Sequence, residues 1–266
     1  MVNWSLEQHI PSRGRALRVQ GPHVSCVGGG VTLTQDLHMP SLEGIYLDYC
    51  SKSHDDPTWL SSTSLKYVLN EDMQGESKGD STAEDRMRRV YSEACKAVPS
   101  TVLRDRFTQS CRSLNESYSA RREYSCQLGL NAAMQYLLSA PAPSARYVLV
   151  CCKSGTMMHT GVTPQYKENI DDEMVLRRNV DLPFRMTRNV VGALSGSFVL
   201  GGTTLSLGLF MDACLANRDV LEVSLSMLIG ADIAERRKGP LRRASSDVTL
   251  VKVIYSSVDI RPHPTI

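Results

Sequence analysis

Apolar residues recur every three or four positions over residues 81–98, a spacing that predicts an amphipathic helix. They are Met87, Val90, Tyr91, Ala94 and Val98. Ser81 and Glu84 have the spacing of a capping box, in which the serine side chain satisfies a free amide of the first turn. Glu84 and Arg88 have the spacing of an ion pair on the other face, and Pro99 ends the pattern.

Two more helices are predicted after Pro99. The first covers about residues 101–115, and we expect its apolar residues to be buried: Leu103, Phe107, Cys111 and Leu114. The second begins near Ser117, and its later part, residues 128–138, is apolar almost all round, which is typical of the centre of a helical bundle. Shorter helices are predicted at residues 41–50 and 60–70.

Three segments are harder to assign. Residues 21–40 are rich in glycine and are expected to form an irregular loop. Residues 145–152 fit either a strand, because of their β-branched side chains, or a buried helix, and the surrounding bundle favours a helix. Residues 156–170 show no period and are expected to be a linker, which divides the chain into an N-terminal domain, 1–155, and a C-terminal domain, 171–266.

The C-terminal part contains a long uncharged stretch between Arg188 and Asp212. It is long enough to cross a bilayer, but five glycines interrupt it. We therefore expect a buried helix–turn–helix with Gly201-Gly202 as the turn. An apolar helix at 219–229 and an exposed basic loop at 235–243 should follow. Residues 247–258 alternate in part and fit a strand in isolation, which conflicts with an otherwise all-α fold.

Charge is distributed unevenly along the 266 residues. Residues 1–80 carry 6 basic and 10 acidic side chains, a net charge of −4, and residues 81–160 carry 11 and 6, a net charge of +5. Residues 161–266 carry 13 and 12, so their net charge is +1. An acidic segment beside a basic one suits head-to-tail self-association or contact with an anionic surface.

Eight arginines of the basic part are candidate membrane- or RNA-binding residues. They lie on three consecutive predicted helices and are Arg86, Arg88, Arg89, Arg104, Arg106, Arg112, Arg121 and Arg122. If these helices pack side by side, the arginines could converge on one face and bind phosphates without sequence specificity. The same face could bind anionic lipid at about 1 kcal/mol per basic residue. Scattered surface arginines with partners one turn away are an open alternative.

Other chemistry is not indicated. Cys151, Cys152 and His159 are the one close group of cysteine and histidine, but adjacent cysteines rarely bind one tetrahedral ion and a fourth ligand is missing. Gly28-Gly29-Gly30 lacks the Lys-Ser/Thr of a phosphate loop, and no nucleophile signature occurs. We predict no metal, no cofactor and no enzymatic activity.

Five short stretches occur in the order and at the spacings found in the N-terminal half of orthomyxovirus matrix proteins. They are Ile10-Pro11-Ser12, Lys66-Tyr67-Val68-Leu69-Asn70, Asp85-Arg86-x-x-Arg89-Val90-Tyr91, Ser117-Tyr118-Ser119-Ala120 and Leu149-Val150-Cys151. Residues 1–153 therefore resemble this family, in particular a thogotovirus-like member. The family's short basic run is replaced here by Ser92-Glu93-Ala94-Cys95-Lys96, so the arginines lie one turn earlier. Of its Cys-Cys-His-His cluster, Cys151 matches cleanly.

The resemblance implies an all-helical N-terminal domain of two small bundles and a helical C-terminal domain. It implies a virion structural protein that polymerises under the envelope, binds acidic lipid on the inner face of the plasma membrane and binds the viral ribonucleoprotein. It also implies passage through the host nucleus and cytoplasm and a role in budding. A nucleocapsid-type protein that packages RNA is the alternative function.

Overall fold

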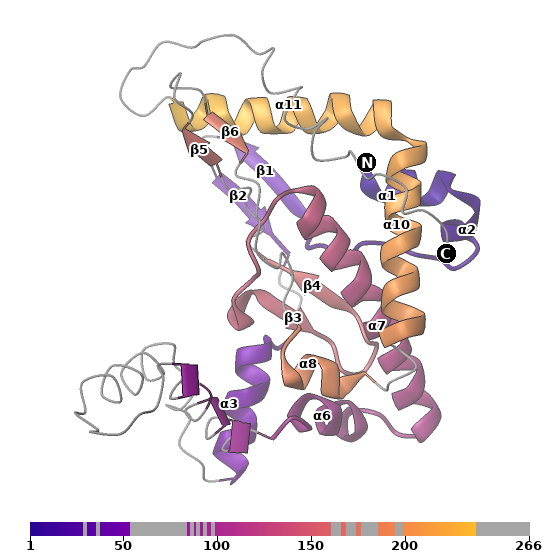
Figure 1. The fold of residues 1–266 in the computed structure, drawn as a ribbon, viewed down its shortest axis with the longest axis vertical. Coiled ribbons are helices and arrows are strands. Elements are labelled where there is room, and N and C mark those ends of the chain that lie inside the picture. The colour runs from indigo at the N-terminus through magenta and orange to yellow at the C-terminus, as the bar shows by residue number, and fades with distance from the viewer. Residues whose placement is uncertain are drawn as a thin grey trace, which may run out of the picture.

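The computed structural model describes residues 1–28, 31–35, 38–53, 84–85, 88, 91–92, 95–96, 99–160, 166–168, 174–176, 186–194 and 199–237. These residues are mainly helical, as predicted, and their helices pack around one long central helix (Figure 1). The helices are α1 (Val2–Gln8), α2 (Ile10–Arg13), α3 (Leu42–Ser53), α6 (Val102–Ser110), α7 (Leu114–Leu137), α8 (Arg188–Ala193), α10 (Thr204–Ala216) and α11 (Arg218–Arg237). Short antiparallel pairs join β1 (Val24–Gly28) to β2 (Val31–Thr34), β3 (Val148–Val150) to β4 (Met157–His159) and β5 (Tyr166–Glu168) to β6 (Met174–Leu176).

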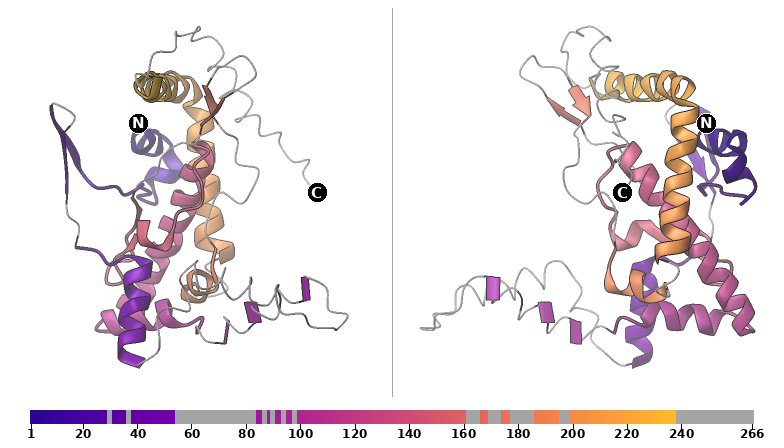
Figure 2. Two further views of the ribbon diagram at one scale, coloured as in Figure 1. Left: turned by 90° about the vertical axis from the view of Figure 1, so that its left-hand side faces the viewer. Right: turned by 45° about the vertical axis from the view of Figure 1, so that its right-hand side comes forward.

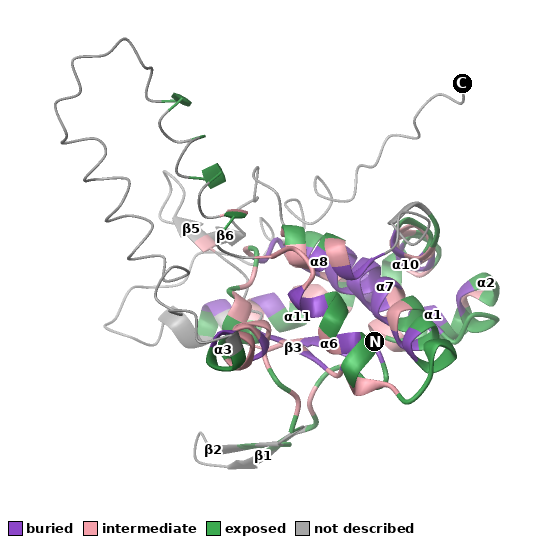
Figure 3. Cartoon of the chain, turned by 90° about the horizontal axis from the view of Figure 1, so that it is seen from below, coloured by how far each residue is buried: buried purple, intermediate pink, exposed green. Residues whose placement is uncertain are grey.

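The central helix is α7. It begins because the Ser113 side chain caps it, accepting a hydrogen bond from the Glu116 amide at 3.2 Å. Its second half is buried on nearly every side, as the apolar stretch predicted, and it appears as the main buried element in Figure 3. One expectation is wrong: Leu114 is not buried at the end of the preceding helix but starts α7, where its side chain is 84% exposed.

Two clusters of buried apolar side chains lie along α7. The first is built by α3, α6, α7, β3 and α8, and its central members are Ile45, Phe107, Tyr124, Val150 and Val190. The second is built by α1, α7, α10 and the start of α11, with Leu6, Leu130, Phe210 and Leu221. Both clusters combine side chains from residues 1–155 with side chains from residues 171–266. The division of the chain at the expected linker stays a prediction.

The two glycines expected to form a turn are instead helical. Gly201 and Gly202 lie in a π-helical turn, Val199–Thr203, that continues directly into α10. A Cβ atom on Gly202 would collide with the Ser125 side chain, so glycine allows this turn to lie against α7. The Ser125 and Thr203 hydroxyls are then 2.9 Å apart. Among the described helices, none is long and apolar enough to cross a membrane.

Three segments predicted as loop, helix and linker contain strands. The Gly-rich segment 21–40 contains the β1–β2 hairpin, with Val24 opposite Thr34, and the hairpin projects from the helical body in the left view of Figure 2. Residues 145–152 contain a 3-10 turn and the strand β3 rather than a helix, because β3 finds backbone partners on two sides. The Val150 amide donates to the Pro40 carbonyl at 3.0 Å, and Val150 pairs with Met157 of β4. Part of the expected linker is therefore the strand β4.

Of the remaining predicted elements, two helices are confirmed, and others lie outside the residues that the structure describes. α3 and α11 confirm the helices predicted at 41–50 and 219–229. The predicted basic loop at 235–243 begins inside α11. The helix predicted at 60–70, most of the helix at 81–98 and the possible strand at 247–258 lie outside the described residues. Within the second of these, the predicted pair is present, with Arg88 Nη2 2.8 Å from Glu84 Oε1.

Candidate basic interface

The candidate arginines are positioned by the contact between α6 and α7. The rings of Phe107 and Tyr124 pack at 5.3 Å between centroids, and both are fully buried. The Leu103 amide donates to Asn189 Oδ1 of α8 at 3.4 Å, which fixes the start of α6. Because Leu103 and Phe107 face inward, the arginines between and beside them leave α6 on its flanks.

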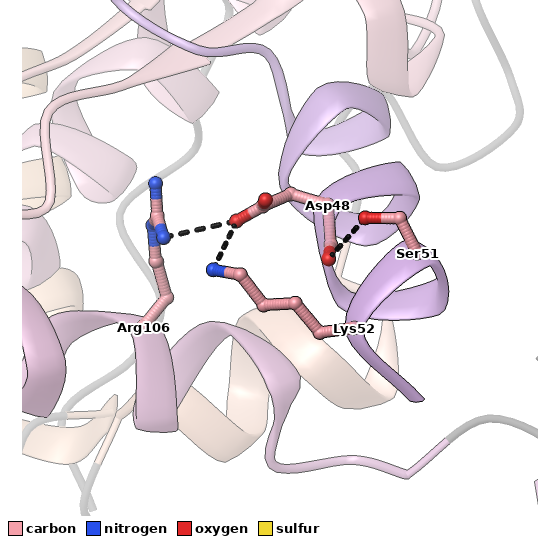
Figure 4. A network of polar contacts seen from close by, with 4 residues as sticks. All are labelled: Asp48, Ser51, Lys52 and Arg106. Carbon is pink, nitrogen blue, oxygen red and sulfur yellow. Dashed lines mark hydrogen bonds and ion pairs between the residues drawn. The ribbon is translucent and has the colours of Figure 1, made fainter. Parts of the chain in front are cut away.

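Arg106 turns towards α3 and forms an ion pair with Asp48. Its Nη1 lies 3.0 Å from Asp48 Oδ2, and Lys52 Nζ lies 2.9 Å from the same oxygen (Figure 4). Ser51 adds a hydrogen bond to the Asp48 carbonyl. The Lys52 hydrogen bond, then the Lys52 and Arg106 charges, lower the pKa of Asp48 below 3.8 against the opposing effect of desolvation. Arg106 therefore links α6 to α3 and is not an unpaired cation.

Arg121 turns the other way, towards α8. Its Nε donates to the Ala193 carbonyl, the last of α8, at 2.7 Å. Partial burial, and secondly the charge of Arg104, lower the pKa of Arg121 below its usual value. Arg104 of α6 is thus a neighbouring cation of Arg121.

The other candidates point to solvent or lie outside the described residues. Arg104 is 3.4 Å from Asp105, and both side chains are about half exposed. Arg112 and Arg122 are exposed, in the α6–α7 turn and on α7. Arg86 and Arg89 lie outside the described residues. The described arginines therefore do not form one flat face: Arg121 is held on the α8 side, whereas Arg106 is held on the α3 side.

This arrangement suits non-specific attraction of anions rather than chemistry. Arginines at the α6–α7 corner can contact phosphate oxygens of lipid or nucleic acid, and each contact would weaken as salt screens it. The described residues contain no group of three or more histidine, cysteine or acidic side chains placed to hold a metal ion. Cys151 and Cys152 lie in the β3–β4 turn, whereas His159 is at the other end of β4, opposite Val148, and contacts Gln135.

Sequence reasoning missed two features of this region. Asp48 was not foreseen as the partner of Arg106, because the two residues are 58 positions apart. The grouping of Cys111 with Cys151 and Cys152 was also missed, because it depends on the pairing of β3 with β4, and β4 lies in the segment predicted to be a linker. The β-branched residues at positions 148 and 150 were a signal for the strand β3.

His159 is a buried titratable group outside the basic corner. Its Nδ1 lies 2.8 Å from Gln135 Nε2, and its buried Nε2 has no hydrogen-bond partner among the described residues. Burial lowers its pKa from 6.5 to about 4. Neutral imidazole is therefore the form that fits between β4 and α7.

The stability of the chain should fall as the pH drops from 7.5 to 5.0. Below pH 6.5 His159 binds a proton in the unfolded chain, whereas the folded chain excludes that proton until about pH 4. The stability that comes from the neutral His159 is therefore fully present above pH 6.5 and is lost progressively as the pH falls below it. The loss by pH 5.0 should be on the order of 2 kcal/mol. His159→Gln should flatten the dependence in urea unfolding, and the exposed His23→Gln should not. Equal slopes in both variants would contradict the assignment to His159.

Comparisons with known proteins leave the family open. No protein-family model and no curated protein matches the chain. Solved structures of similar shape include the complete CtTel1 dimer with C2 symmetry, with a TM-score of 0.58, and the open conformation of CtTel1, with a TM-score of 0.57. Each is 16% identical over 97% of this chain but only 9% of that chain. The FAT and kinase domain of CtTel1 gives a TM-score of 0.56 over 17% of that chain. At this identity the likeness shows a similar helical arrangement alone.

Proposed function

We propose that this chain is a viral structural protein of the orthomyxovirus matrix type, in particular a thogotovirus-like member, and not an enzyme. It assembles with copies of itself into a layer under the envelope. It binds acidic lipid of the inner leaflet and the viral ribonucleoprotein, and it supports budding. Its locations are the virion, the host nucleus and cytoplasm, and the inner face of the plasma membrane.

The positions of the matched sequence stretches support the resemblance. Ser12 in α2, Ala120 in α7 and Val150 in β3 are all buried, and they come from three of the five stretches. Ser12 Oγ is 2.7 Å from His9 Nδ1 and also contacts the Leu209 carbonyl of α10. These stretches therefore supply core contacts between distant elements, which is where a shared fold constrains sequence most.

The finer architecture belongs to the same proposal. The first core cluster and the second core cluster would correspond to the two small helical bundles of the family's N-terminal domain. In this chain α8 and α10 contribute to those bundles, although they follow residue 171. The C-terminal domain remains proposed as residues 171–266, with α8, α10 and the start of α11 docked on the two bundles.

The observation that carries the proposal of self-assembly is an apolar stripe on the outer side of α11. It consists of Val220, Val223, Met227 and Leu228, which are 46%, 62%, 72% and 58% exposed, respectively. The opposite side of α11 is buried through Leu221, Ile229 and Ile233. One apolar side of α11 is thus covered by the rest of the chain, and the other is exposed and available to a partner. Contiguous exposed apolar patches mark interaction sites.

A second copy of this chain is the occupant that fits the α11 stripe. The one charged residue between Val220 and Leu228 is Glu222, which at about 100° per residue lies on the other side of the helix from Val220. Two copies of α11 can therefore lie antiparallel along the stripe without burying a charge. An antiparallel pair also opposes the two helix dipoles favourably. Such a contact is two-fold and closes on itself, so a layer needs a second, different contact. The opposite charges of residues 1–80 and 81–160 can supply it.

Removing two cations at the α6–α7 corner should weaken binding to anionic membranes. Arg112→Gln with Arg122→Gln should reduce partitioning onto phosphatidylserine vesicles by about 30-fold, since each basic residue contributes about 1 kcal/mol near the surface. Arg13→Gln with Arg15→Gln removes the same charge at the far end of the body and is the matched control. Sedimentation with vesicles, at rising salt, measures the effect.

The same sedimentation assay separates the two candidate functions. Wild type should bind phosphatidylserine vesicles, not neutral ones, and should be released as salt screens the surface. Equal loss in the control pair would show a general charge effect rather than a basic interface. Complete displacement by RNA at low concentration, with no self-association, would favour the RNA-packaging alternative.

A further inference from the structure

Three cysteines from two distant parts of the sequence meet beside the α6–α7 turn. Cys111 follows the last residue of α6, and Cys151 and Cys152 follow β3. The Cys111 thiol donates to the Cys152 carbonyl at 3.7 Å, and all three are unpaired thiols. After burial and the charge of Glu116, the Cys151 charge also raises the pKa of Cys111, as expected for a neighbouring thiol.

Cys151 sits in a turn that stabilises a negative sulfur. The turn is closed by hydrogen bonds from the Cys151 amide to the Thr156 carbonyl and from the Gly155 amide to the Cys151 carbonyl, both 2.8 Å. Partial burial raises the pKa of Cys151. Hydrogen bonds from the Ser154 side chain and the Ser154 and Lys153 amides, with the Lys153 charge, lower the pKa to a net value below 9.0.

The two neighbouring thiols differ from Cys151 in reactivity. Burial, and then the charge of Glu116, raise the pKa of Cys111, so Cys111 ionises less readily than Cys151. Burial raises the pKa of Cys152 to about 12, against the opposing charge of Arg106. Cys111 and Cys151 are half-buried, so a small oxidant reaches them, whereas Cys152 is buried. Since the thiolate is the reactive form, the three sulfurs have distinct roles.

We propose that Cys151 is a peroxide-reactive site and that Cys111 is its resolving thiol, so that oxidation forms a Cys111–Cys151 disulfide. The Cys151 thiolate attacks one oxygen of hydrogen peroxide, the O–O bond breaks, and a sulfenic acid and hydroxide result. The Cys111 sulfur then attacks the Cys151 sulfur, the S–O bond breaks, and the hydroxyl leaves as water with the proton from Cys111. The hydroxide from the first step takes up the proton that Cys151 released and becomes the second water. Two thiols are oxidised, and one peroxide is reduced to two waters.

The disulfide would join the α6–α7 turn to the β3–β4 turn. These segments already meet, because Gly155, with φ of +83°, allows the β3–β4 turn to lie against the Ala120 carbonyl of α7. Arg112 is adjacent to Cys111 and Lys153 is close to Cys151 in sequence, so oxidation would fix two cations of the corner relative to one another. The inference rests on the thiol geometry and not on the proposed function.

Peptide mapping of the full-length chain after peroxide treatment tests this assignment. Trypsin releases Cys111 within residues 107–112 and Cys151 with Cys152 within residues 147–153. Wild type should lose two thiols and yield these peptides as a disulfide-linked pair, and the link should persist in Cys152→Ser. Cys111→Ser should accumulate a sulfenic acid on Cys151 that dimedone traps. Cys151→Ser should slow oxidation of Cys111 at least tenfold.

Cys126→Ser is the matched control, since Cys126 is also half-buried but lies away from the β3–β4 turn. It should oxidise like wild type. A bond between Cys151 and Cys152, a link lost in Cys152→Ser, or oxidation that is unchanged in Cys151→Ser would each overturn the proposal. The readout is covalent chemistry, so it can succeed or fail independently of membrane binding and self-association.

Discussion

Replacing Val223 and Met227 with aspartate should abolish the two-fold contact between copies of the chain through α11 and leave the fold intact. Both side chains are exposed on α11, and substitutions away from buried features usually change stability by less than about 0.5 kcal/mol. In the proposed contact each would be buried against a second copy, where an apolar side chain contributes about 1.5–3 kcal/mol. Association should therefore weaken by at least about a hundredfold, measured by sedimentation equilibrium over a range of salt concentrations.

Leu33→Asp is the matched control for the α11 variant. Leu33 is a similarly exposed apolar side chain on β2, so the substitution introduces the same carboxylate away from α11. It should associate like wild type. If the double variant associated as strongly as wild type at high salt, where the charge-based contact is screened, a second copy would be excluded as the occupant of the α11 stripe. Loss of vesicle binding with association retained would show that the stripe contacts lipid instead.

Replacing Phe107 with alanine should produce a large loss of stability. The ring is fully buried in the first core cluster and packs on Tyr124, so its removal leaves a cavity where α6, α7 and α8 meet. Truncation of a buried phenylalanine costs about 3–5 kcal/mol, a large part of the stability of a typical domain. Urea unfolding followed by circular dichroism should show a matching decrease in midpoint.

Leu114→Ala distinguishes the position of Leu114 in the structure from the buried position that the sequence pattern predicted. The pattern placed Phe107 and Leu114 on the same buried face, but in the structure Leu114 is the exposed first residue of α7. Its truncation should change stability by less than about 0.5 kcal/mol. Similar losses in the two variants would mean that α6 continues to residue 114 and that the corner between α6 and α7 is wrong.

The arginines show how far a sequence determines a surface. Their number and their clustering in residues 81–160 are visible in the sequence, because charge is a property of residue type. Their partners are not: Arg106 pairs with Asp48 across 58 positions, and Arg121 binds the Ala193 carbonyl across 72. These contacts decide which cations are held by the fold and which face solvent. From the sequence alone, the solvent-facing Arg112 and Arg122 could not be distinguished from the arginines that are held by contacts within the fold.

The sequence by itself determined the helices, and the tertiary structure decided the strands and the contacts between distant segments. α3, α6, α7 and α11 follow from apolar spacing, since a helix satisfies its backbone within one segment, although the Ser113 cap that begins α7 was not predicted. β3 depends instead on the Pro40 and Thr156 carbonyls and on pairing with β4, so its residues are ambiguous until the chain folds. The meeting of Cys111 with Cys151 has the same origin. Local periodicity encodes the helices, whereas strand pairing and side-chain partners depend on which segments lie side by side.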